Sequence, residues 1–468
     1  MNDGFPPLVL APPESRPRRK ESGRTVPLPS EVLAKRQEIA QILNVKLDKL
    51  SRHLKSLSDD ERRAIFYKLE HEIAVADPRT TLAGTDLKPI AQPSPEVVYA
   101  IPKQESLSKL IQQVDKFATA PIKKQHVPHE WLAHLKDIQE ADPKDRLSDD
   151  LRKRYSRLTK STSVICEIEF LSLERGPNQQ KKEIESWIAD LQQAFAQGVH
   201  GHFFEHEMIP PTCRAVIRCT GSMFKRIVEE PEWIERIRSI ESRPRFQTFH
   251  EILEAFRFQD LAAIPSPPQD APIVCIVDSG VTAGNPFLEK VVRNNFAKSF
   301  LKKDVDNPND EHGHGSAVAS LASYYSLSLA AGAANTPKLW IANARILDKS
   351  NQIEDERLFS RILEDVVVFF KEKGVRIFCL AIGDDRKVWG DATRRVLPRK
   401  SWVARRIDQL SRKHDVVFVT CTGNIDLKEL TDFAKQGNEY PEYLASEAAQ
   451  LLDPGQAALA ITVRAIAP

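Results

Sequence analysis

Residues 271–468 predict an α/β fold in which helices flank a mainly parallel sheet. A smaller α+β domain and a helical N-terminal region are expected to precede it. Strand-like and helix-like segments alternate along residues 271–468, as right-handed strand–helix–strand crossovers require. Several strand-like segments are continuous apolar runs, which is typical of strands that helices cover on both faces. A proline cluster between Ala263 and Gln269 predicts a domain boundary ahead of them.

The composition excludes several classes of protein. A chain of 468 residues predicts about three domains. Hydrophobic residues make up 41% and charged residues 28%, so the chain is neither wholly disordered nor a coiled-coil rod. Lysine and arginine number 67 against 65 aspartates and glutamates, which leaves a formal net charge of +2. This balance predicts neither a nucleic acid nor a membrane as a partner.

The first segment, residues 1–29, is rich in proline and arginine and has no periodicity, so it predicts a disordered tail. The basic run Arg16–Lys20 could contact nucleic acid, but a solvated tail is the favoured interpretation. Charges follow a very short apolar patch, which is the wrong order for a secretory signal, and no run of about 18 apolar residues could cross a membrane.

The six cysteines are scattered singly, and four of them lie inside apolar runs that are typical of strands. Their spacing does not match that of paired metal ligands. Buried thiols in a chain without a secretory signal are most simply reduced core residues. We therefore expect a cytoplasmic protein.

Residues 30–160 predict a helical N-terminal region. A helix begins at Ser30, because apolar side chains recur every three or four residues from Ile39 to Leu57. The capping box Ser58–Glu61 then predicts a second helix that carries Ile65, Phe66 and Leu69. The resulting helical hairpin could bind a partner, although packing against its own protein is favoured.

Residues 163–245 predict a second domain, because strand-like and helix-like segments follow one another there in a recognisable order. The expected elements, in order, are strand Val164–Leu171, helix Lys181–Gln197, strands His200–Met208 and Arg214–Cys219, helix Ser222–Glu229 and strand Ile237–Glu241. This β-α-β-β-α-β order is the ferredoxin-like arrangement. Residues 246–270 are expected to form a linker. His200, His202 and His206 would share one strand face, which is more simply exposed than metal-binding.

The elements expected in residues 271–468 are, in order, Ile273–Val277, His314–Tyr325, Leu339–Ile346, Glu356–Lys373, Val375–Ile382, Trp402–Lys413, Val416–Cys421 and Ala457–Val463. Gly374 ends one helix directly before a strand, as a C-cap glycine does. Active sites in such sheets lie outside the carboxyl ends of the strands.

Three polar residues stand at such positions. Asp278 ends a buried strand, although Asp-Ser-Gly is also ordinary turn chemistry. His314 begins a helix of small residues, where the helix dipole keeps an imidazole neutral and able to accept a proton, or where it simply caps the helix. Asn424 follows a third strand, either as a turn residue or as an amide donor to an oxyanion.

These motifs together resemble the subtilisin-like serine peptidases, the subtilases. Asp278–Gly280 resembles the aspartate motif, His314–Ala319 the histidine motif, Ala381–Gly383 the substrate-binding strand and Thr422–Asn424 the oxyanion motif, in the family's order. The resemblance covers residues 271–468 and implies a subtilisin-like fold, incomplete at its C-terminus. Ser316, Ala317 and Ala381 differ from the residues that are common in the family.

The family's Gly-Thr-Ser-x-Ala nucleophile motif has no counterpart before Pro468, and Ser446 is out of motif and out of order. We therefore expect a chain truncated before the catalytic serine, rather than a natural pseudoenzyme.

The resemblance implies a serine endopeptidase that hydrolyses peptide bonds in a polypeptide substrate. Asp278 and His314 would serve a serine beyond this chain, and Asn424 would donate to the oxyanion. The peptide would lie between two segments, which are Leu380, Ala381, Ile382 and Gly383 on one side and Cys421, Thr422 and Gly423 on the other.

The ferredoxin-like domain gains a role from the same resemblance. Subtilases often carry such a prodomain upstream, as an intramolecular chaperone and inhibitor, and Met223–Ile234 resembles its last helix. An unrelated α+β domain is the alternative. The rival class for the whole protein is a non-catalytic subtilase-like interaction protein. The helical hairpin also resembles a feature of bacterial cytoplasmic subtilases encoded beside AAA-type ATPases, so such an ATPase is a possible partner.

No cofactor is expected. Calcium is a common structural ion in subtilases, and an acidic loop ahead of His314 offers the oxygen ligands Asp304, Asp306, Asn307, Asn309, Asp310 and Glu311. Their spacing matches no known calcium loop, so a solvated loop is favoured and no metal site is predicted.

Overall fold

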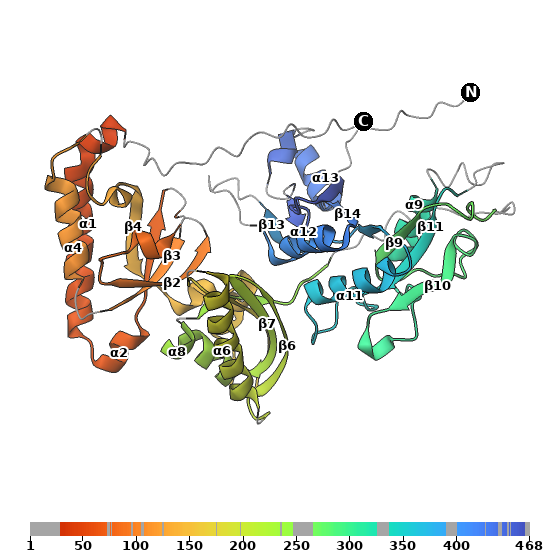
Figure 1. The fold of residues 1–468 in the computed structure, drawn as a ribbon, viewed down its shortest axis with the longest axis horizontal. Helices are drawn as coiled ribbons and strands as arrows, with labels where there is room; N and C mark the ends of the chain where they lie inside the picture. The colour runs from red at the N-terminus through yellow and green to blue at the C-terminus, as the bar shows by residue number, and fades with distance from the viewer. Residues whose placement is uncertain are drawn as a thin grey trace.

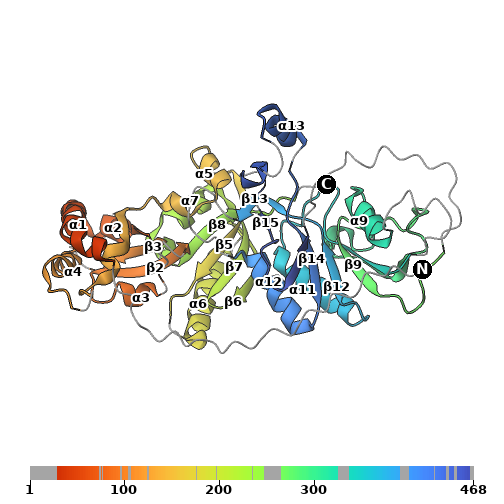
Figure 2. The same ribbon diagram turned by 90° about the horizontal axis from the view of Figure 1, so that it is seen from above.

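The computed structural model describes residues 29–246, 265–324, 337–389 and 400–463, apart from 73–74, 76, 95–96, 104–106, 124–125, 175, 197, 235, 426, 439–441, 447–448 and 450. The predicted tail therefore lies outside the described residues except for Pro29, and so does most of the predicted linker. The sheets form three bodies that follow one another along the longest axis of the molecule (Figure 1, Figure 2).

The N-terminal body is an antiparallel sheet with two helices packed against one face. Its strands are β1 (Tyr67–His71), β2 (Leu87–Ser94), β3 (Val97–Pro102) and β4 (Leu135–Glu140), in the order β2-β3-β1-β4. The long helices are α1 (Ser30–Ser56) and α4 (Ser108–Thr119). The short α2 (Asp59–Ala64) lies between α1 and β1, and the short α3 (Pro78–Thr81) lies between β1 and β2. One apolar cluster joins α1 and α4 to the sheet.

The prediction of a helical region with a hairpin was therefore wrong. The capping box forms, because Ser58 Oγ accepts from the Glu61 backbone amide and the Glu61 side chain accepts from the Ser58 amide. The helix α2 nevertheless ends at Ala64, and Leu69 lies in strand β1. From Tyr67 to His71 every second residue is buried, which is the pattern of a strand that packs one face against a core. The burial arises from contacts with the neighbouring strands, so the local sequence alone does not indicate it.

The middle body has the predicted β-α-β-β-α-β order. It consists of β5 (Ser163–Leu171), α6 (Pro177–Phe195), β6 (Gly201–Ile209), β7 (Thr212–Thr220), α7 (Gly221–Glu229), the short α8 (Pro231–Ile234) and β8 (Ile237–Ser242). The antiparallel sheet has the order β6-β7-β5-β8. Leu147, Leu151 and Tyr155, on and beside α5 (Asp149–Tyr155), pack into the core of this body, so it begins before the predicted residue 163.

The predicted common face of three histidines is also wrong. A bulge between Phe203 and Glu205 shifts the register of β6 against β7. His202 pairs with Arg218 and His206 with Ala215, which lie on opposite faces of β7, and His200 precedes the strand.

The C-terminal body is the predicted parallel sheet flanked by helices. Its strands are β9 (Ile273–Asp278), β10 (Val292–Ser299), β11 (Trp340–Arg345), β12 (Ile377–Leu380), β14 (Val417–Cys421) and β16 (Ala460–Val463), in the order β10-β11-β9-β12-β14-β16. All five pairings are parallel. Strand β10 was not predicted, because its sequence VRNNFAKS is polar over much of its length.

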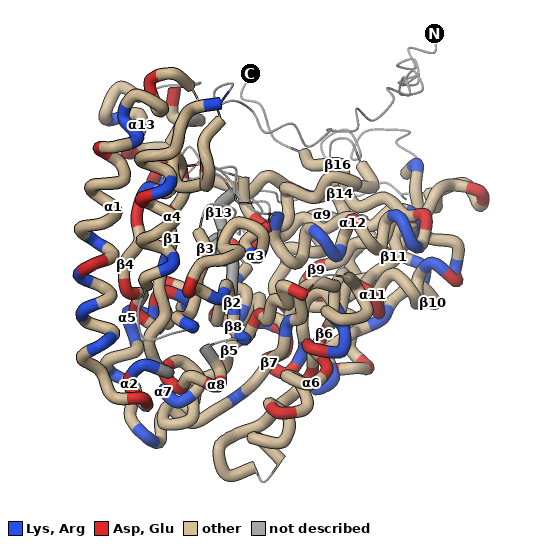
Figure 3. Tube along the Cα trace, turned by 60° about the vertical axis from the view of Figure 1, so that its left-hand side comes forward, with Lys and Arg blue, Asp and Glu red and all other residues tan. Residues whose placement is uncertain are grey.

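Helices cover the two faces of this sheet unequally. Helix α9 (His314–Ser323) packs on one face, and α11 (Phe359–Lys371) and α12 (Trp402–His414) pack on the other. Strands β13 (Asp384–Trp389) and β15 (Leu451–Asp453) form a separate antiparallel pair, and α13 (Leu427–Lys435) projects from the body (Figure 2). Lysines and arginines alternate with acidic residues over all three bodies (Figure 3). No helix in the described part of the chain is both long and apolar enough to cross a membrane.

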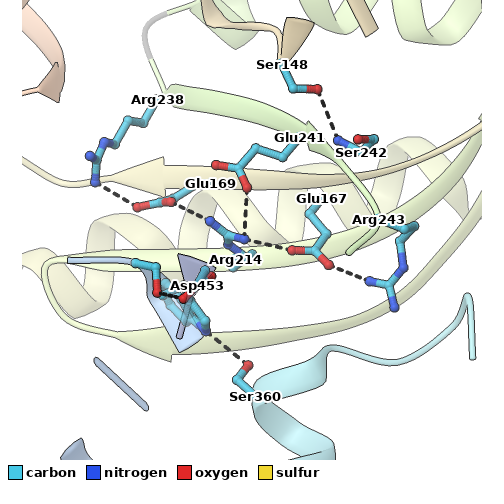
Figure 4. A network of polar contacts seen from close by, with 12 residues as sticks. Ser148, Glu167, Glu169, Arg214, Arg238, Glu241, Ser242, Arg243, Ser360 and Asp453 are labelled. Atoms are coloured by element: carbon cyan, nitrogen blue, oxygen red, sulfur yellow. Dashed lines mark hydrogen bonds and ion pairs between the residues drawn. The ribbon is translucent and has the colours of Figure 1, made fainter. Parts of the chain in front are cut away.

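A buried polar network joins the middle body to α11 and α12. At its centre Arg214 donates to Glu167 over 2.8 Å and to Glu169 over 2.9 Å, and Glu241 lies 3.2 Å from the same guanidinium (Figure 4). Burial raises the pKa of Glu169, but the charges of nearby arginines outweigh burial and lower it to about 2. The sheet face opposite α6 and α7 therefore carries buried charges of both signs that are joined by ion pairs.

Across the interface, Glu207 of β6 accepts from the indole Nε1 of Trp402 over 2.8 Å and from the hydroxyl of Ser360. Arg243, which follows β8, donates to the backbone carbonyl of Glu354 over 3.0 Å. These contacts tie the middle body to the ends of α11 and α12, close to the edge of the parallel sheet.

Candidate active site

Asp278 and His314 meet at the carboxyl edge of the parallel sheet. Asp278 is the last residue of the central strand β9, and His314 is the first residue of α9. The imidazole Nδ1 lies 2.9 Å from each carboxylate oxygen of Asp278. The Asp278 side chain is 1% exposed and that of His314 is 13% exposed. An imidazole that donates from Nδ1 leaves Nε2 free to accept a proton, so this pair can act as a general base.

The surroundings of His314 favour its protonated form. Burial alone lowers the pKa of the imidazole, but the hydrogen bond to Asp278 and the charges of Asp278 and Asp310 outweigh burial and raise the pKa above its ordinary value. A carboxylate pair that stabilises imidazolium suits a histidine that takes up a proton during a reaction.

Two glycines bring the pair together. Gly280 has a φ of +110°, and a Cβ atom there would lie 2.6 Å from the carbonyl oxygen of Pro308. Gly315 lies directly over the turn that follows β9, where a Cβ atom would lie 2.0 Å from the carbonyl oxygen of Gly280. The first turn of α9 can approach the end of β9 only because position 315 has no side chain.

Asp310 is a residue that the sequence analysis counted only among possible metal ligands. Its carboxylate accepts from the backbone amides of His312, Gly313 and Ser316 and from the hydroxyl of Ser279. It therefore holds the N-terminus of α9. An acid four residues before a helix-opening histidine is the sequence signal that could have found it.

Arg345 occupies the acidic loop that was considered for calcium. This residue ends β11, is 1% exposed, and pairs in register with Asp278. Its guanidinium donates to Asp304 and Glu311, each over 2.8 Å, and to the carbonyl oxygen of Asn307 over 3.0 Å. No group of acidic, histidine or cysteine side chains within the described residues has the arrangement of a metal site. An arginine inside an apolar strand segment is the signal that was overlooked.

Asn424 lies on the same edge but at a distance from the pair. It follows β14, and β12 lies between β14 and β9, so two strand spacings of about 5 Å each separate it from Asp278. Its side chain is exposed. The structure thus brings Asp278 and His314 into contact and leaves Asn424 apart from them, on the side of the sheet edge that β16 continues.

The two segments predicted to hold a peptide flank another side chain. Leu380 and Ile382 point into the apolar core beneath α11 and α12. Leu452 of β15 fills the space between Gly383 and Gly423, because a Cβ atom on either glycine would lie 3.2 Å or less from it. Its backbone amide also donates to the carbonyl oxygen of Thr422 over 2.9 Å. The sequence analysis missed Leu452, since nothing local indicates that it reaches this position.

Within the described residues, the sheet face that carries Asp278 is more exposed toward β16 than toward β9. Register pairs Ile276, Cys379, Val419 and Ile461 in one row across β9, β12, β14 and β16. Ile276 is buried under α9, Cys379 and Val419 are partly buried, and Ile461 is 57% exposed. Val463 of the same edge strand is 52% exposed. Ile461 and Val463 thus leave two aliphatic side chains exposed on one face of the strand β16.

Comparison with known proteins gives two matches. The model of the Subtilase family of peptidases matches residues 269–468. The uncharacterized protein y4bN of Sinorhizobium fredii (strain NBRC 101917 / NGR234) is 31% identical over 108 residues, which are 23% of this chain and 24% of that protein. The chain therefore matches about a quarter of the length of this relative.

Proposed function

Because residues 269–468 form a domain of the subtilase family, we propose that this protein is a serine endopeptidase that hydrolyses polypeptides with Asp278, His314 and a serine outside residues 1–468. The contact between the His314 imidazole and the Asp278 carboxylate is the observation that carries the proposal. Its position at the carboxyl edge of a parallel sheet is where such folds place their chemistry.

The proposed reaction is acyl transfer to water. The serine hydroxyl attacks the peptide carbonyl carbon while His314 Nε2 takes its proton, and Asp278 holds the Nδ1 hydrogen and stabilises the imidazolium. His314 then gives the proton to the leaving amine as the C–N bond breaks. A water molecule repeats the sequence on the acyl-enzyme and releases the acid. Asn424 would donate to the oxyanion in both halves.

The exposed side chains on this face of the sheet support a nucleophile that a further segment of the chain carries. Ile461 and Val463 are exposed on the face on which α9 packs, and His314 begins that helix. We propose that a helix from beyond residue 468 covers this face in the full protein and carries the serine at its N-terminus. Burial of aliphatic side chains would drive the docking, at about 25 cal/mol per Å² of apolar surface.

The middle body is proposed to act as the prodomain. Phe246, which follows β8, pairs antiparallel with Asp384, directly after the segment proposed to bind peptide. The chain leaving the middle body thus runs beside that segment. The polar network around Glu207 and Trp402 would hold the prodomain on α11 and α12.

The location and partners are proposed as well. All six cysteines are free thiols, which suits a reducing cytoplasm. Polypeptides are the proposed substrates. Leu452 fills the space between Gly383 and Gly423, where the substrate peptide is proposed to lie. This side chain favours the second candidate function, which is a non-catalytic interaction protein with an AAA-type ATPase as its partner.

Fluorophosphonate labelling of the full-length gene product tests the proposal. We expect labelling of a serine beyond residue 468, abolished by His314→Ala and slowed by Asp278→Asn. The matched control is His202→Ala, because His202 is an exposed residue of β6 in the middle body and not in the C-terminal body that holds the site. A full-length product that does not label, or that labels equally with His314→Ala, would exclude the triad and favour the interaction protein.

A further inference from the structure

Asp310 binds the first turn of α9 through both of its carboxylate oxygens. Oδ1 accepts from the amide of Gly313 over 2.7 Å, from the amide of His312 over 2.9 Å and from the hydroxyl of Ser279 over 2.9 Å. Oδ2 accepts from the amide of Ser316 over 2.8 Å. These four donors come from both sides of His314 and from the residue that follows Asp278.

The carboxylate has two effects at this position. The first amides of a helix have no partner within the helix, and Asp310 satisfies those of Gly313 and Ser316. It also places a negative charge at the positive end of the helix dipole. Burial raises the pKa of Asp310, but its hydrogen bonds outweigh burial and lower the pKa, so Asp310 stays ionised.

The loop that carries Asp310 is itself anchored in the sheet. Arg345 binds Asp304 and Glu311 at the two ends of the loop. Asn343, two residues earlier on β11, donates to the carbonyl oxygen of Pro308 over 2.8 Å. The loop is therefore attached to the strand next to β9 at several points, and the position of Asp310 is set by the sheet.

We propose that Asp310 is the positioning residue of His314. The loop that Arg345 holds places the Asp310 carboxylate at the start of α9. There the carboxylate orients the His314 imidazole toward Asp278 and adds a second negative charge beside the imidazole. The proposal rests on the proposed function only in naming His314 as the catalytic base. The arrangement itself belongs to the described residues and can be tested without a nucleophile.

Among the described residues, two carboxylates act on the charge of the His314 imidazole. Asp278 faces His314 from β9 and Asp310 faces it from the loop, and both raise the pKa of the imidazole against the effect of burial. Cys379 on β12 and Cys421 on β14 lie within electrostatic range of Asp278. Burial raises the pKa of Cys379 to about 12 and also raises that of Cys421, so both thiols are neutral near pH 7.

Nuclear magnetic resonance of the whole chain, labelled at histidine, tests the proposal. His314→Ala assigns the His314 signal among the 12 histidines. We expect Asp310→Asn to lower the pKa of His314 and to speed hydrogen exchange at the Gly313 and Ser316 amides. The matched control is Asp306→Asn, because Asp306 is an exposed carboxylate of the same loop. It should leave both measurements near their wild-type values.

An unchanged His314 pKa in Asp310→Asn, or an equal fall in Asp306→Asn, would overturn the proposal. If circular dichroism shows that Asp310→Asn does not fold, Asp310→Glu decides. This variant keeps the charge but moves it by one methylene, so the His314 pKa should stay raised while the two amides exchange faster. A loss of the raised pKa in Asp310→Glu with unchanged exchange would contradict the role. None of these readouts needs peptidase activity, so failure here and failure of the proposed function can be told apart.

Discussion

Gly315 stands directly against the carbonyl oxygen of Gly280, where a Cβ atom at position 315 would approach that oxygen to 2.0 Å. The same Cβ atom would lie 3.2 Å from Cβ of Asp278. The start of α9 and the end of β9 therefore touch through backbone atoms. The hydrogen bond between His314 and Asp278 depends on this contact, since His314 directly precedes Gly315 and Asp278 lies two residues before Gly280.

Replacement of Gly315 by alanine should separate the helix from the strand. We expect a loss of about 1–3 kcal/mol in the free energy of unfolding, as is typical when a methyl group is forced into a packed region. Urea denaturation measures it. Gly284→Ala is the matched control, because nothing lies within 4 Å of a Cβ atom there. Similar losses in the two variants would show that the contact is not tight.

The pairing of His314 with Asp278 should give stability a defined pH dependence. The pKa of His314 is raised in the folded chain, whereas an imidazole in the unfolded chain titrates near about 6.5. Protonation therefore favours the folded state. The contribution is complete below about pH 6.5 and is lost as the pH rises through the raised pKa.

The stability difference between wild type and His314→Gln should accordingly be larger at about pH 6 than at about pH 9. Urea denaturation at both pH values gives the two differences. A difference that grows as the pH rises would mean that the folded state lowers the pKa.

Arg214 should be essential to the stability of the middle body. Arg214→Met leaves Glu167, Glu169 and Glu241 without their shared cation, and removal of one partner from a buried ion pair costs about 3–5 kcal/mol. Arg226→Ala is the control, because Arg226 pairs with Glu230 at the surface, where ion pairs contribute about 1 kcal/mol or less. Thermal and urea unfolding of both variants compares them, and equal effects would contradict the importance of burial.

Arg345 should make the acidic loop independent of calcium. We expect the melting temperature of the wild type to be the same in EDTA and in calcium chloride, because Asp304 and Glu311 already bind a cationic side chain. Arg345→Met should be less stable by about 1–3 kcal/mol, because the two carboxylates it leaves are partly exposed to solvent. Calcium should restore part of the loss by neutralising these carboxylates. A wild-type melting temperature that falls in EDTA would contradict this reading.

The sequence predicted the parts of the fold that local pattern determines. Strand β9 and helix α9 are apolar or small-residue runs with punctuating glycines, and their predicted bounds differ from the observed ones by a few residues at most. The approach of Asp278 and His314 was predicted because the carboxyl ends of parallel strands share one edge. Strand β1 was mistaken for helix because its alternation is short and follows a true capping box.

Other features depend on contacts between distant parts of the chain. The local sequence around Asp310 and Arg345 marks both residues as unusual, but only the packed loop shows what they bind. Leu452 reaches Gly383 and Gly423 because β15 pairs with β13. The periodicity of the sequence does not indicate this pairing. Residues that position a site are thus harder to predict than residues at its centre.

The strand β16 has a consequence for the behaviour of the protein in solution. No other described strand pairs with the outer edge of β16, and a free strand edge with aliphatic side chains on one face is a template for pairing with another molecule. Purified at high concentration, this polypeptide should self-associate, and light scattering should rise with concentration. Ile461→Lys or Val463→Lys should therefore reduce this self-association and improve solubility.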